Sequence, residues 1–360
     1  MTQQSDFIVI GGGIAGVSAG ARLAALGKVT VLEAEGALGY HASGRSAALY
    51  VEGYGNPGVR ALTTASHDHH RHADGGVLSD RGLMLVAGAD REDDFEHEHR
   101  DMHLDPITLE DAHARMPILN LDVVTRAAFS ADVWDIDTDL LLQNFARTVR
   151  ATGQIVTGAK VEAITRTANS WQVTAAGQDY TAPKLVNAAG AWVDEVARMA
   201  GIQPLGFKPL RRSMARLPAP GGLDVSTWPM VFASGDAWYA KPDAGALLVS
   251  PSEEDPAEPH DAWADDMVLA EGLARYEEMV SEPVVRLISN WAGLRTFAPD
   301  RNLVIGRDLR DPDFLWCAGQ GGYGFQTAPA ASQLLADLVS GTASELPGDV
   351  LAQLLPDRLG

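Results

Sequence analysis

The stretch Phe7-Ile8-Val9-Ile10-Gly11-Gly12-Gly13-Ile14-Ala15-Gly16 is the most informative part of this sequence. Its first four residues are apolar and mostly β-branched, which indicates a strand buried on both faces. Three glycines break the strand, and residues 14–26 continue as a helix of small residues that we expect to end at Gly27. A second buried strand is predicted at residues 29–33. The order of strand, glycine turn, helix and strand predicts a parallel βαβ unit.

The glycine spacing in this unit predicts a dinucleotide site. In Gly11-x-Gly13-x-x-Gly16 the glycines permit a tight turn and a close approach of the backbone to a pyrophosphate, which the start of the helix then faces. Glu33 ends the second strand, 22 residues after Gly11. A carboxylate there can accept hydrogen bonds from the ribose hydroxyls of an adenosine. The motif alone does not separate NAD from FAD.

Two further features favour FAD. The motif begins at residue 11, so the dinucleotide domain opens the chain. A second glycine-rich turn, residues 319–324, stands between a predicted strand at 315–318 and a predicted helix at 327–339. This second turn would bring the C-terminal part of the chain back to the cofactor, as FAD requires because it is longer than NAD.

Composition and charge narrow the class of protein. The chain has 360 residues and a formal charge of −20, so we expect two domains or one large α/β domain, with no nucleic-acid partner and no strong membrane signal. The single cysteine, Cys317, excludes an intramolecular disulfide and any cysteine-cluster metal site. Residues 8–26 are long enough to span a bilayer. However, they contain five glycines and no basic residue precedes them, and both features argue against a membrane helix or a signal peptide.

Proline is concentrated in the middle of the chain. Nine of the nineteen prolines lie between residues 204 and 259, among short strand-like runs, which suits the edges and loops of an antiparallel sheet. Helices are predicted from residue 56 to the histidines at 67–72, over 137–152 and around 267–280. We interpret the histidine cluster as a solvated helix end and predict no metal site.

Five segments together resemble the D-amino-acid oxidase-like (DAO) superfamily of flavoproteins. They cover nearly the whole chain and lie at residues 10–16, 39–48, 186–192, 291–297 and 319–324. The sequence looks most similar to the bacterial D-arginine dehydrogenase-type branch, through Tyr40-His41 with residues 44–48, Arg211-Arg212-Ser213 and residues 239–243.

The resemblance implies an α/β fold. Its FAD-binding Rossmann-like domain, of the glutathione-reductase type, would be discontinuous and comprise residues 1–80, 140–203 and 290–360. The inserted antiparallel β-rich substrate domain would comprise residues 81–139 and 204–289.

The resemblance also implies which residues hold FAD. Residues 42–48 would pass along the flavin and its phosphates, with Arg45 and Ser46 donating hydrogen bonds to them. The backbone of Val161 would hold the adenine. Residues 321–326 would present backbone N–H groups and a helix N-terminus to the flavin pyrimidine oxygen, which stabilises the anionic reduced flavin. The full predicted set is Gly11, Gly13, Ile14, Ala15, Gly16, Glu33, Ala34, Ala42, Ser43, Gly44, Arg45, Ser46, Ala47, Ala48, Val161, Ala188, Gly190, Gly321, Gly322, Tyr323, Gly324, Phe325 and Gln326.

For the substrate, the resemblance implies a carboxylate held by Arg295, since a guanidinium can form two parallel hydrogen bonds to a carboxylate. Tyr239 would add a phenolic hydroxyl, and Tyr54 and Arg212 would line the same pocket. The expected reaction is oxidative deamination of a D-amino acid to a 2-oxo acid and ammonia, by hydride transfer from Cα to the flavin, with no dedicated side-chain base. The alternatives are a flavoenzyme acting on an N-methyl amino acid, an opine or a 2-hydroxy acid, and a flavin-binding subunit without turnover.

Two departures from the family pattern refine these expectations. Thr296-Phe297-Ala298 stands where some members attach FAD to a cysteine, so non-covalent FAD is expected. The branch often carries a carboxylate in the segment that matches residues 81–84, but Leu83 is apolar, which favours a neutral or apolar substrate side chain.

The electron acceptor, whether oxygen, a quinone or another compound, stays open. We expect a cytoplasmic protein, with peripheral attachment to the inner membrane as the alternative.

Overall fold

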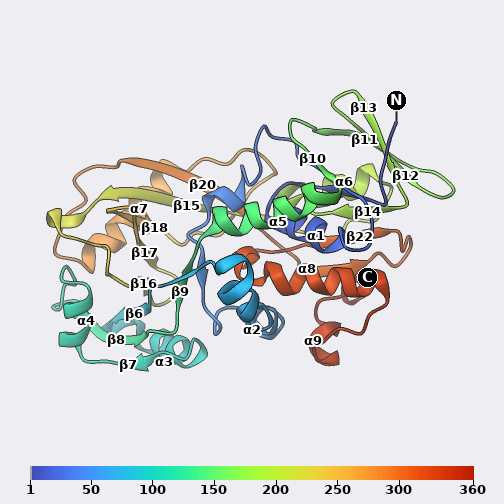
Figure 1. The fold of residues 1–360 in the computed structure, drawn as a ribbon. Helices are drawn as coiled ribbons and strands as arrows, with labels where there is room; N and C mark the ends of the chain where they lie inside the picture. The colour runs from blue at the N-terminus through green and yellow to red at the C-terminus, as the bar shows by residue number, and fades with distance from the viewer. Residues whose placement is uncertain (1) are drawn as a thin grey trace.

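A six-stranded sheet organises the half of the molecule that contains both chain ends in this computed structural model, which describes residues 2–360 (Figure 1). Its strand order is β10-β3-β2-β14-β22-β21. All neighbours are parallel except β21, which runs antiparallel to β22. The strands are β2 (Phe7–Ile10), β3 (Val29–Leu32), β10 (Gln154–Val156), β14 (Lys184–Asn187), β21 (Val304–Arg307) and β22 (Phe314–Ala318).

Alternation along β2 explains how this sheet is covered on both faces. Phe7 and Val9 pack into a core with α1 (Ile14–Leu23), α5 (Thr138–Thr152) and α8 (Gly324–Ser340). Ile8 and Ile10 point to the opposite face, where they pack against a four-stranded sheet and α6 (Val193–Met199). That second sheet consists of β1 (Gln3–Gln4), β11 (Val161–Arg166), β12 (Trp171–Ala175) and β13 (Gln178–Ala182). The predicted parallel βαβ unit is therefore confirmed.

The predicted end of the first helix is wrong by three residues. Helix α1 ends at Leu23, and residues 24–26 form a turn in which Leu26 N–H donates to the Leu23 carbonyl at 2.8 Å. Gly27 is needed for a different reason, because a Cβ there would lie 2.6 Å from a carboxylate oxygen of Asp6.

The other predicted helices are confirmed, with shifted ends. Helix α2 (Pro57–His72) begins after Asn56, whose side chain accepts from Val59 N–H at 3.2 Å. Helix α5 has Asp137 as its N-cap, α7 spans Asp266–Glu278, and α8 begins three residues before the predicted position 327. No helix within residues 2–360 is long and apolar enough to cross a membrane.

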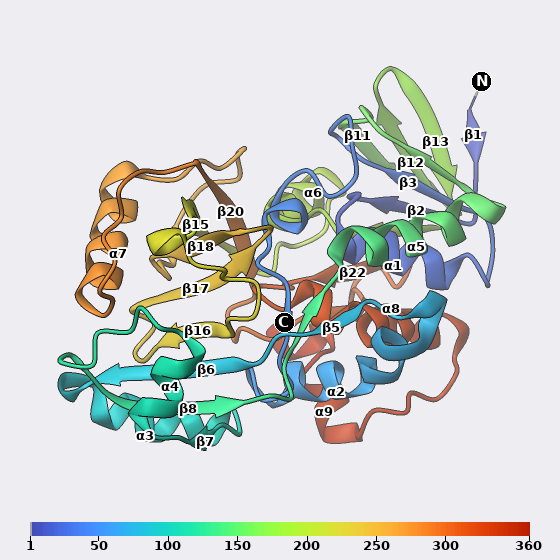
Figure 2. The same ribbon diagram turned by 60° about the vertical axis from the view of Figure 1, so that its left-hand side comes forward.

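A nine-stranded sheet forms the other half of the molecule (Figure 2). The path β19-β15-β18-β17-β16-β6-β8-β7 contains eight strands, and β20 pairs with β15 beside it. The pairs within this sheet are antiparallel, as predicted, except for β6 and β16, which are parallel. The strands are β6 (Leu83–Gly88), β7 (Asp105–Pro106), β8 (Val124–Ser130), β15 (Lys208–Pro218), β16 (Met230–Ala233), β17 (Trp238–Asp243), β18 (Ala246–Ser250), β19 (Asp255–Pro256) and β20 (Ser289–Phe297).

Each of these two sheets takes its strands from several separate parts of the chain. Strand β20 lies almost entirely after residue 290, yet it pairs with β15 along nine residues, so it belongs to the nine-stranded sheet. A small three-stranded sheet links the halves, because β9 (Trp134–Ile136) pairs with β4 (Leu49–Tyr50) and β5 (Leu78–Asp80). The domain boundaries themselves stay a prediction.

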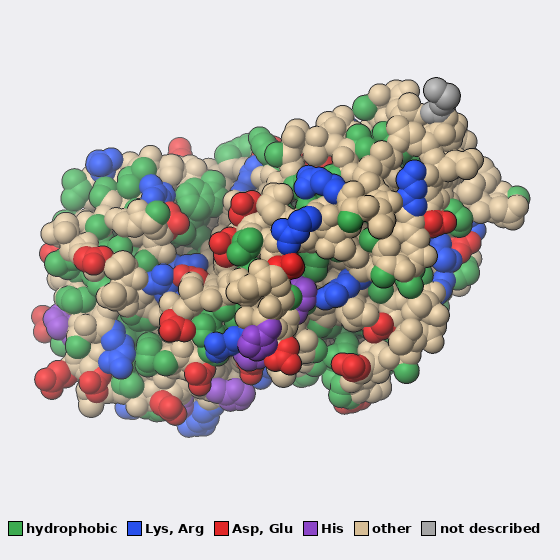
Figure 3. All heavy atoms as spheres, in the orientation of Figure 1, with side chains coloured by type: hydrophobic (Ala, Val, Ile, Leu, Met, Phe, Trp, Pro, Cys, Tyr) green, Lys and Arg blue, Asp and Glu red, His purple; other side chains and the backbone are tan. Residues whose placement is uncertain are grey.

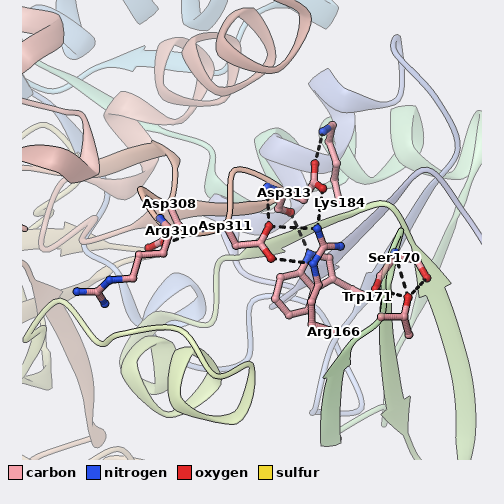
Figure 4. Close-up of polar contacts among 9 residues, drawn as sticks. Arg166, Ser170, Trp171, Lys184, Asp308, Arg310, Asp311 and Asp313 are labelled. Carbon is pink, nitrogen blue, oxygen red and sulfur yellow. Dashed lines mark hydrogen bonds and ion pairs between the residues drawn. The ribbon is translucent and has the colours of Figure 1, made fainter.

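Ion pairs fasten the four-stranded sheet to the six-stranded sheet (Figure 4). Arg166 on β11 donates from Nε to Asp311 at 2.7 Å and from Nη2 to Asp313 at 2.8 Å. Lys184 on β14 reaches the other oxygen of Asp313 at 2.8 Å, and Trp171 donates to the Asp313 carbonyl at 3.2 Å. Elsewhere, acidic and basic side chains are interspersed on the face that Figure 3 shows.

Candidate functional site

The glycine turn after β2 has the close backbone approach that its sequence predicts. Gly11 has a φ of +113°, and a Cβ on it would lie 2.3 Å from the Ala188 carbonyl oxygen. A Cβ on Gly16 would lie 1.9 Å from the Gly11 carbonyl oxygen. Neither position can carry a side chain unless the backbone moves. Gly13 is the N-cap of α1 and has no side chain to cap the helix, so the Ile14 N–H donates instead to Ser43 Oγ at 3.0 Å.

Glu33 lies directly after β3, beside this turn. One carboxylate oxygen accepts from Gly12 N–H at 2.5 Å and the other accepts from Glu35 N–H at 2.8 Å. Burial raises the pKa of the Glu33 carboxyl, and these two backbone donors oppose that rise. Each oxygen keeps a further lone pair, so the group can still accept from ribose hydroxyls, as the sequence predicts.

An elongated cavity of about 470 Å³ runs from Glu33 along the glycine turn. Its walls come from six separate parts of the chain, at residues 10–13, 32–45, 159–161, 188–199, 260–262 and 294. Val161 lines the Glu33 end, and Gly190, with a φ of +55°, lines the wall after β14. The predicted cofactor residues that line this cavity are Gly11, Gly13, Glu33, Ala34, Ala42, Ser43, Arg45, Val161, Ala188 and Gly190.

A second cavity continues from the first. Ala42, Ser43 and Arg45 line both, so the short helical turn at residues 42–45 connects them. The predicted flavin-contacting residues in the second cavity are Ile14, Ala42, Ser43, Arg45, Ser46, Ala47, Ala48, Gly321, Gly322, Gly324, Phe325 and Gln326. The two connected cavities have the glycine turn at residues 11–13, here called the glycine cradle, at one end and the N-terminus of α8 at the other. They fit an FAD molecule.

Four of the predicted cofactor residues line neither cavity. Gly16 and Gly44 serve the turns, since a Cβ on Gly44 would lie 2.5 Å from the Gly39 carbonyl oxygen. Ala15 lies inside α1, where its carbonyl accepts from Ser18 Oγ at 3.2 Å. Tyr323 packs its ring against Tyr54, with the ring centroids 5.2 Å apart.

The four predicted substrate-site residues meet in the second cavity. Arg295 comes from β20, Tyr239 from β17, Arg212 from β15, and Tyr54 from the loop after β4. Arg295 Nη2 donates to the Tyr239 hydroxyl at 3.5 Å, and no Asp or Glu among residues 2–360 forms an ion pair with it. A Cβ on Gly322 would lie 3.1 Å from Arg295 Nη1, so the C-terminal glycine turn and this guanidinium are in direct contact.

The Arg295 guanidinium stays charged in this setting. Burial lowers its pKa, but the nearby oxygens of Tyr239, Tyr54 and Tyr323 and the Glu254 carboxylate raise it, and the net shift is upward. A cation without a carboxylate partner, facing a cavity, is suited to bind an anionic ligand group.

Arg212 differs from Arg295 because protein groups already satisfy it. Its Nε donates to the Glu253 carbonyl at 2.9 Å, and its Nη2 lies 3.3 Å from Glu254. Its guanidinium carbon lies 5.8 Å from the ring centroid of Tyr239, so Arg212 supports the tyrosine as well as lining the cavity.

Arg45 also has protein partners, which the sequence did not reveal. Its Nη1 donates to the carbonyls of Ala262 and Ala292, both at 2.8 Å, and its Nη2 pairs with Asp261. The residue lines both cavities, but the predicted donation from its side chain to the cofactor stays a prediction.

Sequence reasoning missed much of the substrate cavity. Met214 lies two residues after Arg212 on β15, and Phe232 lies two residues after Met230 on β16, so strand alternation could have identified both pairs. The loop between β16 and β17 adds Asp236, an exposed carboxylate, for which no sequence signal existed. Leu83 lies behind the wall, in one apolar cluster with Met214, Met230 and Tyr239.

The lone cysteine lines neither cavity. Cys317 is buried between β22 and α1, with its Sγ 3.7 Å from the Ala15 carbonyl oxygen. Burial raises the pKa of its thiol to about 12, so it is protonated at neutral pH. Across the described chain, from residue 2 to residue 360, no three His, Cys, Asp or Glu side chains gather as metal ligands.

Comparisons with known proteins agree with this site. The family model described as DAO, FAD dependent oxidoreductase, matches residues 6–338. Glycine oxidase of Bacillus licheniformis is 26% identical over 372 residues, which cover 95% of this chain and 94% of that protein. The fold is similar to that of L-proline dehydrogenase from P. horikoshii, with a TM-score of 0.82, 21% identity and 96% of each chain covered.

A cofactor-bound structure shares the fold as well. L-α-glycerophosphate oxidase from Mycoplasma pneumoniae, with FAD bound, has a TM-score of 0.83 and 20% identity, and the match covers 94% of this chain and 95% of that one. The glycine cradle, the two connected cavities and the family match lead to one conclusion: this chain belongs to the DAO family of FAD dependent oxidoreductases, and its cofactor is FAD.

Proposed function

We propose that this enzyme catalyses the oxidative deamination of a D-amino acid with a neutral or apolar side chain, giving a 2-oxo acid and ammonia. The observation that carries this proposal is the Arg295 guanidinium, which faces the substrate cavity beside the Tyr239 hydroxyl and has no carboxylate partner within residues 2–360. When bound, FAD supplies the acceptor for the hydride that leaves the substrate Cα.

The chain's own residues bind and orient the substrate. Arg295 and Tyr239 hold the substrate carboxylate, and this fixes the position of Cα relative to the turn at residues 321–324. No side chain is assigned as a base, because the amine of the substrate needs only to lose its proton to the solvent before its lone pair forms the imine. Water then hydrolyses the imine to the 2-oxo acid and ammonia.

The walls of the cavity support the preference for an apolar side chain. Met214, Met230, Phe232 and Trp238 line it, which is a surface that thioether, aliphatic and aromatic substrate groups would contact. The resemblance to the D-arginine dehydrogenase-type branch supports the D configuration. An N-methyl amino acid, an opine or a 2-hydroxy acid presents the same carboxylate and is the alternative substrate class.

One observation favours a second candidate, a D-amino acid with a cationic side chain. Asp236 lines the same cavity from the loop between β16 and β17, and its carboxylate is free to pair with an ammonium or guanidinium group. This candidate requires a substrate long enough to reach that loop from Arg295.

Anaerobic flavin reduction tests these proposals. The purified FAD-bound enzyme is mixed without oxygen with matched D- and L-forms of alanine, methionine, phenylalanine, lysine and arginine, and the flavin absorbance is followed. We expect bleaching by D-methionine and D-phenylalanine and not by their L-forms. Faster bleaching by D-arginine, lost in Asp236→Asn, would establish the second candidate instead. No bleaching by any amino acid, with a bound and chemically reducible flavin, would refute both.

A further inference from the structure

Helix α8 begins at the proposed flavin end of the site and contains a proline in its second turn. Gly324, Phe325 and Gln326 line the substrate cavity, and Pro329 follows within the helix. Proline has no N–H, so the Phe325 carbonyl lacks its usual donor four residues on. The start of this helix therefore has one backbone hydrogen bond fewer than a helix without proline.

Helix α2 contacts this part of α8 through three side chains with no exposed surface, and two of them bond backbone groups of α8. His70 Nε2 donates to the Gln326 carbonyl at 3.0 Å, and Ser66 Oγ accepts from Ala330 N–H at 3.1 Å. The Gln326 side chain donates to Thr63 Oγ1 at 3.0 Å. The residues are spaced at 63, 66 and 70, so they share one face of α2, the face that packs on α8.

The His70 imidazole is neutral and carries its proton on Nε2, so it acts as a hydrogen-bond donor. Its Nδ1 is buried without a hydrogen-bond partner, which places the ring proton on Nε2, toward the Gln326 carbonyl. Burial lowers the pKa of the imidazole to about 4. His70 therefore donates this hydrogen bond throughout the neutral pH range.

We propose that His70 is a positioning residue for FAD: by holding the Gln326 carbonyl, it fixes the first turn of α8 against the flavin ring. The inference rests on the proposed placement of that ring at residues 321–326. It goes beyond the proposed reaction, because it concerns the affinity and the reduction potential of the cofactor, whatever the substrate. The positive end of a correctly placed helix favours the reduced, anionic flavin.

The test compares His70→Met with His72→Met. Methionine is similar in volume to histidine and is a good helix former, but it lacks the N–H. His72 is an exposed histidine at the end of the same helix, so His72→Met controls for the change of residue type. FAD affinity is measured by titrating the apoprotein and following flavin fluorescence, and the midpoint potential is measured by dye-coupled reduction. Neither measurement includes an amino acid, so a failed substrate assignment cannot affect the result.

We expect His70→Met to weaken FAD binding about tenfold, the loss of one buried hydrogen bond, and to lower the midpoint potential. His72→Met should match the wild type. His70→Gln can place a donor near the Nε2 position and should recover FAD affinity to within about threefold of the wild type.

Wild-type FAD affinity and potential in His70→Met would overturn the proposal, even if its melting temperature fell, because His70 would then only fill the core. If His70→Met does not fold, His70→Gln and His70→Asn decide, since the asparagine side chain is one methylene too short to reach Gln326. A lower FAD affinity and potential in the asparagine variant than in the glutamine variant support the proposal. Equal values overturn it.

Discussion

At the scale of the residue, Arg295 carries the main functional expectation, because it is a cavity-facing cation whose hydrogen-bond partner among residues 2–360 is a phenol, that of Tyr239. Replacing it as Arg295→Met removes a charge-assisted pair of hydrogen bonds to the substrate carboxylate. We expect kcat/KM for the best amino acid to fall about 100-fold, which corresponds to about 3 kcal/mol, with most of the loss in KM. Steady-state kinetics with a dye acceptor would measure this.

Arg301→Met is the matched control for that substitution. Arg301 pairs with both oxygens of Glu254 at 2.9 Å and lines neither cavity, so its loss should change kcat/KM by less than about threefold. A wild-type KM in Arg295→Met would mean that another group holds the substrate.

At the scale of the element, helices and strands with a clear local sequence pattern were predicted correctly, whereas the pairing of strands far apart in the sequence was not. The parallel strands β2 and β3 were predictable because each is a short, mostly β-branched run, and a glycine turn and a helix separate them. Helix α5 was predictable because Asp137 caps it and its apolar residues recur with the helical period. The parallel pairing of β6 with β16 joins segments about 150 residues apart, and packing of the completed sheet, rather than local sequence, determines it.

The ion pairs that join the two sheets of the FAD half give a prediction at this scale. Burial raises the pKa of the Asp313 carboxyl, but Lys184 and Arg166 lower it more, so the folded protein holds this group charged below its ordinary pKa. Asp313→Asn should lower the free energy of unfolding by about 1–2 kcal/mol at pH 7, since the pairs are partly screened by solvent. Urea denaturation would measure the loss, with the exposed Asp132→Asn as a control that should be neutral.

The pH dependence of that loss follows from the direction of the shift. A carboxyl with a lowered pKa in the folded state stabilises the protein above its unfolded pKa, near 3.8, and the contribution disappears as the pH falls through the lower folded value. The difference between wild type and Asp313→Asn should therefore be constant from pH 5 to 8 and shrink below about pH 4. A difference that grows on acidification would contradict this account.

At the scale of the whole molecule, the two halves meet across the cofactor site, and the sequence could not show how. The segment before α7 crosses from the nine-stranded sheet to the FAD cavity, where His260 and Ala262 form part of the wall. Arg45 and Asp261, far apart in the sequence, form an ion pair there, and the Tyr40 hydroxyl donates to Asp261 at 3.4 Å. Only the completed tertiary structure brings residues 40–45 and 260–262 together.

The contact between residues 40–45 and 260–262 leads to a prediction about how the protein retains FAD. Asp261→Asn removes the charge that Arg45 pairs with but leaves the Arg45 hydrogen bonds to the carbonyls of Ala262 and Ala292 intact, so the segment loosens without leaving the cavity. Because exposed ion pairs contribute only about 0.2–1 kcal/mol, we expect the rate of FAD release to rise about two- to fivefold. Stopped-flow flavin fluorescence after dilution would measure it, with Glu258→Gln, an exposed charge on the same segment, as the control. High salt should raise the wild-type rate toward that of the variant, since it screens the pair. Identical release rates for all three proteins at low salt would show that the segment covers the cavity without holding the cofactor.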